Sequence, residues 1–146
     1  MINYKTYTSI AKPDGIEREA VVSFLYKHLG EYGDAKEDIE KAIIYAVKDE
    51  PVAGGFVLVA RNNEEIVGAV VVNRTGMEGY IPENILVYIA VHEFQRGKGL
   101  GKGLMNEAVK ISKGDIALHV EPENPARFLY EKIGFSSKYV EMRLKK

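Results

Sequence analysis

The chain has 146 residues, 46% of them hydrophobic and 28% charged, which is enough for one core and too little for two ordinary domains. A net charge of -1 excludes the strongly basic surface that binds nucleic acid or anionic membranes. The absence of cysteine excludes disulfides, thiolate metal sites and a cysteine nucleophile. Since no apolar run has transmembrane length and no signal-peptide pattern is present, we expect one cytoplasmic domain, 1–146.

The N-terminal half predicts a short strand, two helices and a hairpin. Asp14 followed by Glu17 has the form of a capping box, and the helix that begins there ends at Gly30. A second helical pattern with one apolar side follows, and two β-branched runs joined by Asn-Asn-Glu-Glu then predict a β-hairpin. The predicted elements are a strand at 4–10, helices at 14–30 and from about 36, and strands at 56–61 and 66–73.

The C-terminal half alternates strands and helices. Its first strand, ILVYIAV, is almost unbroken apolar sequence, as expected of a central strand covered on both faces. A glycine-rich stretch then opens a helix, and the last segment, KYVEMRLKK, alternates in polarity like a strand. The predicted elements are a strand at 85–91, a helix at 100–113, a strand at 115–121, a helix at 125–133 and a strand at 138–146. This order predicts an α+β fold.

The stretch QRGKGLGKG, residues 95–103, has glycine at every second position from 97 and basic side chains at 96, 98 and 102. At the start of a helix, free N–H groups and the helix dipole favour an anion, and glycine lets the anion approach the main chain. The stretch therefore predicts a phosphate site. The P-loop and dinucleotide fingerprints both fail, because they require glycine where the chain has Lys102 or Leu104. The alternative is that these glycines form only a tight turn and close helix packing.

At these residues the sequence resembles a known family. Arg96 to Gly101 matches the R/Q-x-x-G-x-G/A motif of the GNAT superfamily of N-acetyltransferases, in which these amides bind the pyrophosphate of acetyl-CoA. The segment ENPARFLYEKIGF, residues 123–135, is similar to the family's second motif. The segment IAVHEFQ before the glycines is similar to its fourth strand. The two motifs occur in the family's order, and together with the strand they span residues 85–135.

The resemblance implies the GNAT fold, a single mixed, mostly antiparallel sheet with a splayed central parallel pair and about four flanking helices. The splay leaves a V-shaped cleft, in which acetyl-CoA is expected as cosubstrate, without a metal. The resemblance implies that the amide of Ile89 bonds the acetyl carbonyl and that the main chain of Val91 pairs with pantetheine. The implied cofactor-binding residues are Ile89, Val91, Arg96, Gly97, Lys98, Gly99, Gly101, Lys102 and Asn124.

Catalysis by such a protein needs a neutral amine, whereas an alkyl ammonium with a pKa near 10.4 is less than about one part in a thousand neutral at pH 7. A base or water relay must help, and a donor must meet the leaving thiolate. The resemblance assigns the donor role to Tyr130. The base position of the family's fourth strand falls on Ile85, so the base stays open. His119 is the first candidate and Glu83 the second, with Glu121 behind them.

Each of these residues also has a structural interpretation. Tyr130 is an amphipathic aromatic that can cap a core, and His119 can be a half-buried strand histidine. Exposed carboxylates such as Glu83 and Glu121 are most often solvated surface. Asn124 departs from the resemblance, because it precedes the tyrosine by six residues where the family commonly has seven, with Pro125 between.

The leading hypothesis is direct acetyl transfer from acetyl-CoA to a primary amine in a ternary complex. Two alternatives stay open: a non-catalytic module that binds or senses acyl-CoA on the same fold, and a nucleotide-binding enzyme that uses the same glycines. We expect a small-molecule or peptide amine as the acceptor, bound by the first two helices, loop 73–84 and the following strand. Carboxylates there would suit a cationic amine: Glu78, Glu83, Asp49 and Glu50. A homodimer also stays open.

Overall fold

The computed structural model describes residues 1–49 and 54–146, which form four α-helices and one five-stranded sheet. The helices are α1 (Gly15–Leu29), α2 (Lys36–Ala46), α3 (Leu100–Ile111) and α4 (Ala126–Ile133). The strands are β1 (Ile2–Tyr7), β2 (Gly55–Asn62), β3 (Glu65–Arg74), β4 (Asn84–Val91) and β5 (Ile116–Leu118). They lie in chain order, antiparallel up to β4 and parallel between β4 and β5. This confirms the fold that the resemblance implies.

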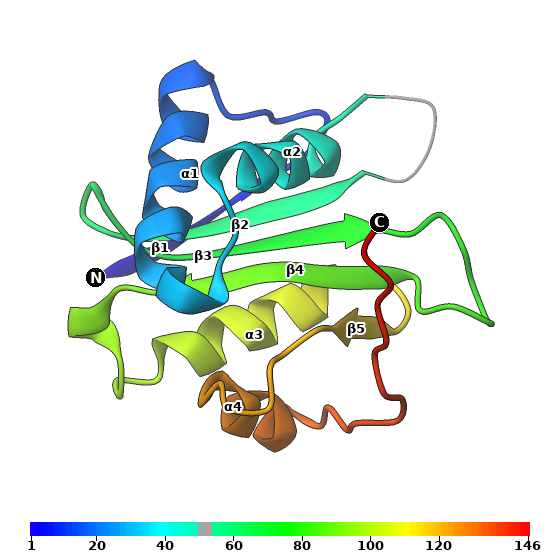
Figure 1. Ribbon diagram of the computed structural model, residues 1–146. Coiled ribbons are helices and arrows are strands. Elements are labelled where there is room, and N and C mark those ends of the chain that lie inside the picture. Colours follow the sequence, from blue (N-terminus) through cyan, green and yellow to red (C-terminus); the bar gives the residue numbers. More distant parts are fainter. Residues whose placement is uncertain (50–53) are drawn as a thin grey trace.

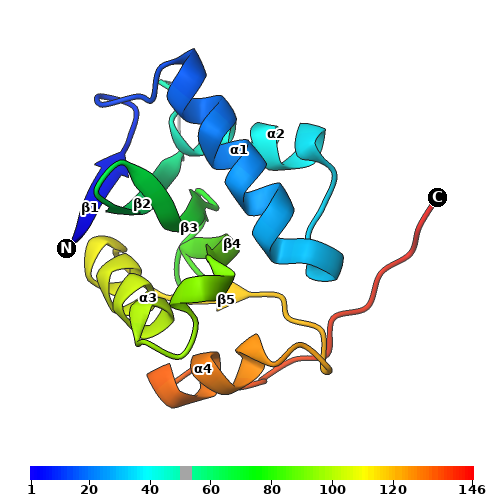
Figure 2. The same cartoon turned by 90° about the vertical axis from the view of Figure 1, so that its left-hand side faces the viewer.

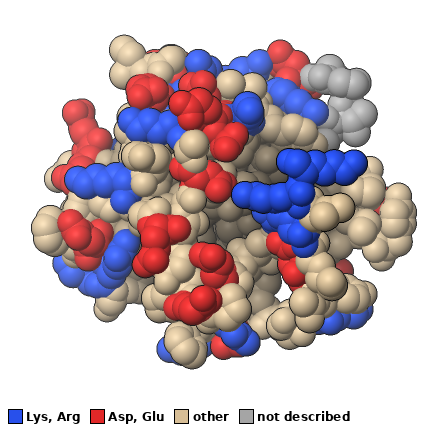
Figure 3. Space-filling view, in the orientation of Figure 1, with Lys and Arg blue, Asp and Glu red and all other residues tan. Residues whose placement is uncertain are grey.

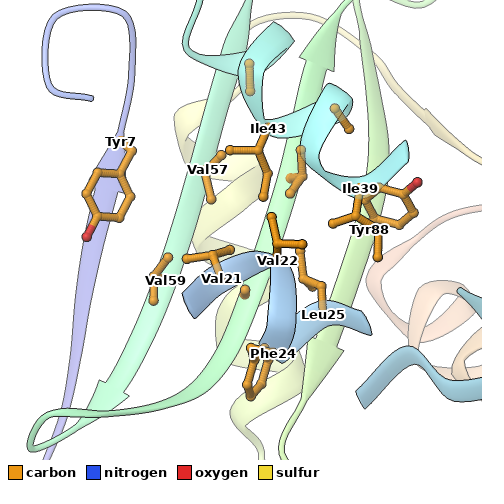
Figure 4. Close-up of a cluster of buried hydrophobic side chains, with 14 of the residues drawn as sticks. Tyr7, Val21, Val22, Phe24, Leu25, Ile39, Ile43, Val57, Val59 and Tyr88 are labelled. Carbon is orange, nitrogen blue, oxygen red and sulfur yellow. The ribbon is translucent and has the colours of Figure 1, made fainter. Parts of the chain in front are cut away.

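The sheet lies between two pairs of helices. Helices α1 and α2 cover one face and α3 and α4 the other (Figures 1 and 2). The first core cluster, between the sheet and α1 and α2, is drawn in Figure 4. The second core cluster lies between the sheet and α3 and α4. Because β2 and β3 bury side chains on both faces, their sequences are continuous apolar runs. Each fully buried Val or Leu side chain contributes about 1.5–3 kcal/mol to the stability of the fold.

Local sequence signals are confirmed at the start of α1. The Oδ1 atom of Asp14 accepts a hydrogen bond from the Glu17 N–H at 2.7 Å, and Oε1 of Glu17 accepts one from the Asp14 N–H at 3.0 Å. Gly30, with φ +58°, ends the helix. The capping box and the glycine stop depend only on neighbours within a few residues, which is why the sequence predicts both.

A β-bulge shapes the middle of β4. Val71 lies opposite Tyr88, whereas Val72 lies opposite Leu86, so Val87 is an extra residue in the β3–β4 pairing. As a result, Val87 and Tyr88 both lie against the first core cluster, although neighbouring residues of a regular strand point to opposite faces.

The parallel pair separates as predicted. β4 pairs with β5 only through Asn84–Leu86 against Ile116–Leu118. Buried Asn84 holds this junction, since its Nδ2 donates to the carbonyl oxygens of Lys113 at 2.7 Å and Asp115 at 3.2 Å. Beyond Leu86 the two strands diverge. β5 is therefore shorter than the predicted strand at 115–121, because it ends where its pairing with β4 ends.

Two predictions at the ends of the chain need correction. The first strand spans Ile2–Tyr7 instead of 4–10. The strand predicted at 138–146 is wrong, because residues 138–146 have no strand structure and no paired neighbour. Alternating polarity marks a segment that can form a strand, but a strand also needs a partner from elsewhere in the fold. Within residues 1–49 and 54–146, none of the helices has the length and hydropathy to cross a membrane.

Candidate active site

The separation of β4 from β5 leaves one edge of β4 open over Val87–Val91. On the other side, the His92 N–H donates to the Val67 carbonyl of β3 at 2.8 Å. Main-chain groups of successive strand residues point to opposite sides, so those of Ile89 and Val91 point away from β3 toward the open edge. These are the two positions that the resemblance assigns to the acetyl group and to pantetheine.

The N-terminus of α3 lies just beyond this edge and offers free amides. Gly99 precedes the helix in the left-handed conformation, φ +84°, and Gly97 has φ +79°. The first helical bond runs from the Gly103 N–H to the Gly99 carbonyl, so the N–H groups of residues 100–102 have no acceptor within the helix. A Cβ at Gly97 or Gly99 would meet no other atom within 4 Å, so conformation and not packing requires glycine there.

The other two glycines of the motif serve packing. A Cβ on Gly101 would lie 3.2 Å from Cδ2 of Leu129, on α4. A Cβ on Gly103 would lie 2.8 Å from the hydroxyl oxygen of Tyr4, on β1. A Cβ at Gly101 or Gly103 would therefore crowd a neighbouring side chain, whereas Gly97 and Gly99 allow the conformation of the turn before α3.

The basic side chains of the motif also have two different settings. The guanidinium of Arg96 donates to the carbonyls of Val91, at 3.4 Å, and His28, at 3.2 Å. It thus ties the last turn of α1 to the end of β4. Lys98 and Lys102 are exposed beside the free amides and add positive charge where an anion would lie.

Tyr130 of α4 faces the same part of the sheet. It is buried in the second core cluster, against which Ile89 and Val91 also pack, and its ring meets that of Phe135 edge-on at 6.1 Å. Burial raises the pKa of Tyr130 to about 12. The hydroxyl therefore stays protonated at every physiological pH and can donate a hydrogen bond.

The candidate bases lie in different settings. His119 and Glu121 follow β5 directly and are exposed. Glu83 instead accepts hydrogen bonds from the N–H groups of Gly79, at 2.9 Å, and Asp115, at 2.6 Å. These backbone bonds lower the pKa of Glu83, which makes it a weaker base. Its carboxylate joins loop 75–83 to the start of β5, so it acts as a structural anchor.

A hollow of about 330 Å³ lies beside the bulge, on the side of β4 that Ile85 and Val87 face. Its lining comes from α2, the end of β3, the following loop and β4, which is where the acceptor is expected. The lining residues are Tyr45, Asn73, Arg74, Thr75, Met77, Ile85 and Val87. Asn73 has a buried Oδ1 without a hydrogen-bond partner, so an unsatisfied acceptor adjoins the hollow. Sequence reasoning singled out neither Tyr45 nor Asn73, because polar residues at strand and helix ends are common.

Comparison with known proteins identifies the family. The sequence matches the family described as Acetyltransferase (GNAT) domain over residues 53–137, more than half of the chain. The chain belongs to the GNAT acetyltransferase family. A comparison with curated proteins gives no significant match.

Solved structures with this fold carry several functional descriptions. A transcriptional regulator from Bacillus halodurans C-125 is 22% identical, with TM-score 0.70 and 100% of both chains covered. A ribosomal-protein-alanine N-acetyltransferase from Brucella melitensis biovar Abortus 2308 is 19% identical, with TM-score 0.64 and coverage of 100% of this chain and 99% of that one. An aminoglycoside antibiotic 6'-N-acetyltransferase from Acinetobacter haemolyticus is 16% identical, with TM-score 0.70 and coverage of 99% and 97%. At these identities the likeness shows the GNAT fold alone.

Asn124 of this GNAT domain has a local structural contact. Its Oδ1 accepts a hydrogen bond from the Ala126 N–H at 2.9 Å, at the start of α4. The N-cap residue of α4 is Pro125, so this bond joins the residue before the cap to the first helical residue. The Oδ1 acceptor of Asn124 is thus engaged by the main chain of α4.

Of the carboxylates expected to attract a cationic amine, the three in the described part of the chain, Asp49, Glu78 and Glu83, do not line the hollow. Asp49 pairs with Lys12 at 2.9 Å, and Glu83 is bound by backbone amides. Glu78 is exposed, and Glu50 lies outside the described residues. Figure 3 shows this face of the GNAT domain, hollowed near its middle, with basic side chains to the right of the hollow and acidic and basic side chains mixed to its left. Charge on this face therefore does not favour one sign of acceptor.

A second hollow, of about 510 Å³, lies between α1 and the β2–β3 hairpin. A row of four tilted rings borders it. The ring centroids are 4.5 Å apart between Phe24 and His28, 4.6 Å between His28 and His92, and 5.1 Å between His92 and Phe94. Burial and, to a smaller extent, the neighbouring His92 lower the pKa of His28. Its imidazole therefore stays neutral to a lower pH than that of an ordinary histidine. These rings pack the end of α1 against the loop that leads to the glycines. The sequence places Phe24 and His28 on one face of their helix and His92 on that loop, but it does not predict that the rings meet.

Proposed function

We propose that this protein is an N-acetyltransferase that transfers the acetyl group of acetyl-CoA directly to a primary amine, within a ternary complex. One observation carries the proposal: the open edge of β4 lies next to the free amides at the start of α3. An extended chain can add to such an edge as a strand, and a pyrophosphate suits such a helix start. Membership of the GNAT family supports the same cosubstrate.

The described residues fit acetyl-CoA in three places. The main chain of Ile89 and the N–H of Val91 face the gap and can pair with the pantetheine arm, while the Val91 carbonyl accepts a hydrogen bond from Arg96. Gly97 and Gly99 leave open space above the turn, where a side chain would block the approach of phosphate. Lys98 and Lys102 add charge around that space. These three features support the binding of an elongated molecule with an anionic end, which is the chemical form of acetyl-CoA.

When bound, acetyl-CoA supplies an acetyl thioester. The amine nitrogen forms a bond to the carbonyl carbon, the carbon–sulfur bond breaks, and the sulfur leaves as a thiol after gaining a proton. The N–H of Ile89 would donate to the acetyl oxygen as negative charge develops there. His119, which follows the short β5, would accept the amine proton through water. The absence of cysteine agrees with direct transfer.

Tyr130 would act mainly as a hydrogen-bond donor to the leaving sulfur. With a pKa of about 12, against about 8.5 for a thiol, full proton transfer from Tyr130 is uphill by about 5 kcal/mol. A hydrogen bond from a neutral phenol stabilises the developing thiolate without that cost. The proton that neutralises the sulfur would therefore come from the amine side or from water.

The hollow beside the bulge is the proposed acceptor site. Its apolar residues Met77, Ile85 and Val87 suit a carbon chain, and Asn73 offers a hydrogen-bond group. Two of the structures that share the fold are described as enzymes that acetylate a ribosomal-protein alanine and an aminoglycoside, so the fold accepts both peptide and small-molecule amines.

The test is release of free CoA from acetyl-CoA, measured with a thiol reagent, in the presence of a panel of peptide and small-molecule primary amines. Mass spectrometry of each reaction identifies the acetylated product. We expect thiol release that depends on one class of amine, with one acetyl group per acceptor. Tight binding of acetyl-CoA without turnover for any amine would favour a sensing module. ATP or NAD binding in place of acetyl-CoA would overturn the proposal.

A further inference from the structure

Residues 92–96 lead from β4 into the glycine turn, residues 97–99, and contact the end of α1. The Arg96 guanidinium donates to the carbonyl of His28, in the last turn of α1, and to the carbonyl of Val91, the last residue of β4. The row of four rings joins the same two elements, with one central ring on α1 and the other on the loop after β4. The position of the glycine turn therefore depends on how residues 92–96 pack against α1.

His92 is held by its main chain and by both nitrogens of its ring. Its N–H donates to the Val67 carbonyl of β3 at 2.8 Å. Its Nδ1 accepts the Phe94 N–H at 3.2 Å and so caps the 3-10 helix η2 (Glu93–Gln95). Its Nε2 lies 3.6 Å from Oε1 of Glu65. Because a ring nitrogen that accepts a hydrogen bond carries no proton, these contacts require a neutral His92 with its proton on Nε2.

Protonation of this pair of histidines would disturb the segment in two ways. A proton on Nδ1 of His92 would prevent it from accepting the Phe94 N–H, and η2 would lose its cap. The ring centroid of His28 lies 4.6 Å away, so two charged rings would repel each other. The lowered pKa of His28 agrees with this setting, since its ring takes up a proton only below the ordinary histidine value of about 6.5.

Charged side chains face the pair or line the hollow beside it, from α1, the loop after β4 and the β2–β3 hairpin. The cations are Lys27, Arg61 and Arg96, and the carboxylates are Glu17, Glu64, Glu65 and Glu93. Among the described residues, only Glu65 lies within ion-pair distance of either imidazole. Its side chain is 70% exposed, so water screens its attraction for a protonated His92. The described part of the chain thus offers no buried carboxylate to stabilise two charged rings.

We propose that His92 is a positioning residue for acetyl-CoA binding, and that its neutral pairing with His28 holds the glycine turn in the conformation that binds the pyrophosphate. His92 acts through the Phe94 N–H and through the path of residues 92–96, without touching the cofactor. When the pair takes up protons, η2 loses its cap, the rings repel, and the turn loses its support from α1. Acetyl-CoA affinity is therefore full while the pair is neutral and falls as the pH falls. This inference rests on the acetyl-CoA binding proposed above.

Calorimetry with acetyl-CoA between about pH 7.5 and pH 5 measures this dependence. We expect the wild-type affinity to fall by about tenfold more than that of His92→Asn, because an asparagine oxygen can accept the Phe94 N–H and does not titrate. His28→Phe keeps a ring in the row and should also reduce the fall. Phosphate groups of the ligand titrate near pH 6 with every variant, so the difference between proteins isolates the histidines. His119→Gln, which removes the only other histidine, is the control and should keep the wild-type pH dependence.

The outcomes separate this inference from the proposed function. Parallel pH curves for wild type and folded His92→Asn would overturn the inference. An equal loss of affinity at every pH in His92→Asn would overturn it as well, because that result indicates a structural role alone. Failure of the folded wild-type protein to bind acetyl-CoA at pH 7.5 would instead contradict the proposed function.

Backbone amide NMR of the free protein tests the coupling without any ligand. As the His92 ring takes up a proton, the amide signals of Phe94, Gly97 and Gly99 should move along the same titration curve as the ring signals of His92. In His92→Asn these three amides should stay in place over the same pH range. If they do not move in the wild-type protein, or if they follow a different curve from the ring, the inference is overturned whether or not acetyl-CoA binds.

Discussion

The two proposed halves of the site, at the open edge of β4 and in the hollow beside the bulge, are formed by different kinds of chemical groups. On the proposed cofactor side, the open edge of β4 and the start of α3 present main-chain groups, and the positive φ of the turn requires glycine at 97 and 99. On the proposed acceptor side, the hollow beside the bulge is lined by side chains from four separate segments. A site that binds through main-chain groups needs glycines at fixed spacing, which form a short motif in the sequence. A site lined by side chains from separate segments has no such motif. This difference explains why the sequence predicts the proposed cofactor half of the site and does not predict the proposed acceptor half.

The largest expected effect is on the main-chain half. Gly99→Val places a β-branched residue at φ +84° and should reduce acetyl-CoA affinity by about a hundredfold or more, because the turn must rearrange. Calorimetry measures the affinity, with circular dichroism to check folding. Gly15→Ala is the matched control, since a Cβ there meets nothing within 4 Å and its φ is not positive. If folded Gly99→Val protein bound acetyl-CoA with unchanged affinity, the proposed dependence of the cofactor half on this glycine turn would be contradicted.

A second expected effect concerns Tyr130. Tyr130→Phe keeps the ring in the second core cluster and should lower kcat by about 10²–10³-fold while leaving acetyl-CoA affinity unchanged. Steady-state kinetics combined with calorimetry separates the two quantities. A loss of affinity equal to the loss in kcat would indicate a packing role instead.

The raised pKa of Tyr130 also predicts a pH effect on stability. Its pKa rises from 10.0 to about 12 on folding, so the folded chain holds this proton where the unfolded chain has lost it. The associated stability is fully present below pH 10 and is lost as pH rises toward about 12, by about 3 kcal/mol. Urea denaturation of wild-type and Tyr130→Phe protein across this range should therefore show a steeper decline for wild type. Parallel declines would contradict the burial of Tyr130.

A smaller effect is expected on the acceptor half. Met77→Trp fills part of the hollow and should raise the KM of the acceptor by about tenfold without changing the affinity for acetyl-CoA. Glu78→Trp, at the neighbouring exposed residue that does not line the hollow, is the control. Equal effects of the two substitutions would mean that the acceptor binds elsewhere.

The smallest effect on catalysis is expected at Glu83. Its carboxylate accepts two backbone hydrogen bonds, which lower its pKa, so it contributes stability above the unfolded pKa that is lost as pH falls through the folded pKa. Glu83→Gln should lower the melting temperature at neutral pH and leave the pH profile of kcat/KM in place. A shift in that profile would restore Glu83 as a candidate base.

The sequence predicts features that depend on neighbouring residues. The capping box at Asp14, the turn at Gly99 and the apolar run of β4 all follow from local patterns, and the structure confirms them. The bulge at Val87 and the short pairing of β5 depend on register between strands, which no local pattern specifies. The same limit explains the segment at 138–146, whose pattern is that of a strand although no strand forms within the chain.

Candidate residues follow the same rule. The structure leaves the main chains of Ile89 and Val91 on the edge of β4 that β5 does not pair with, and their part in cofactor binding stays a prediction. The structure gives Glu83 and Asn124 local backbone contacts, which sequence patterns could not distinguish from functional positions. Asn73 and Tyr45 come together only through folding, from β3 and α2.

The central claim is that the open edge of β4 and the turn before α3 bind acetyl-CoA through their main chains. A titration of the 15N-labelled protein with acetyl-CoA, followed by backbone amide NMR, tests it most directly. We predict that the amide signals of residues 87–91 and 97–102 move together and saturate, while those of β1 and β2 stay in place. Changes confined to the hollow between α1 and the β2–β3 hairpin, or no changes at all, would contradict the account.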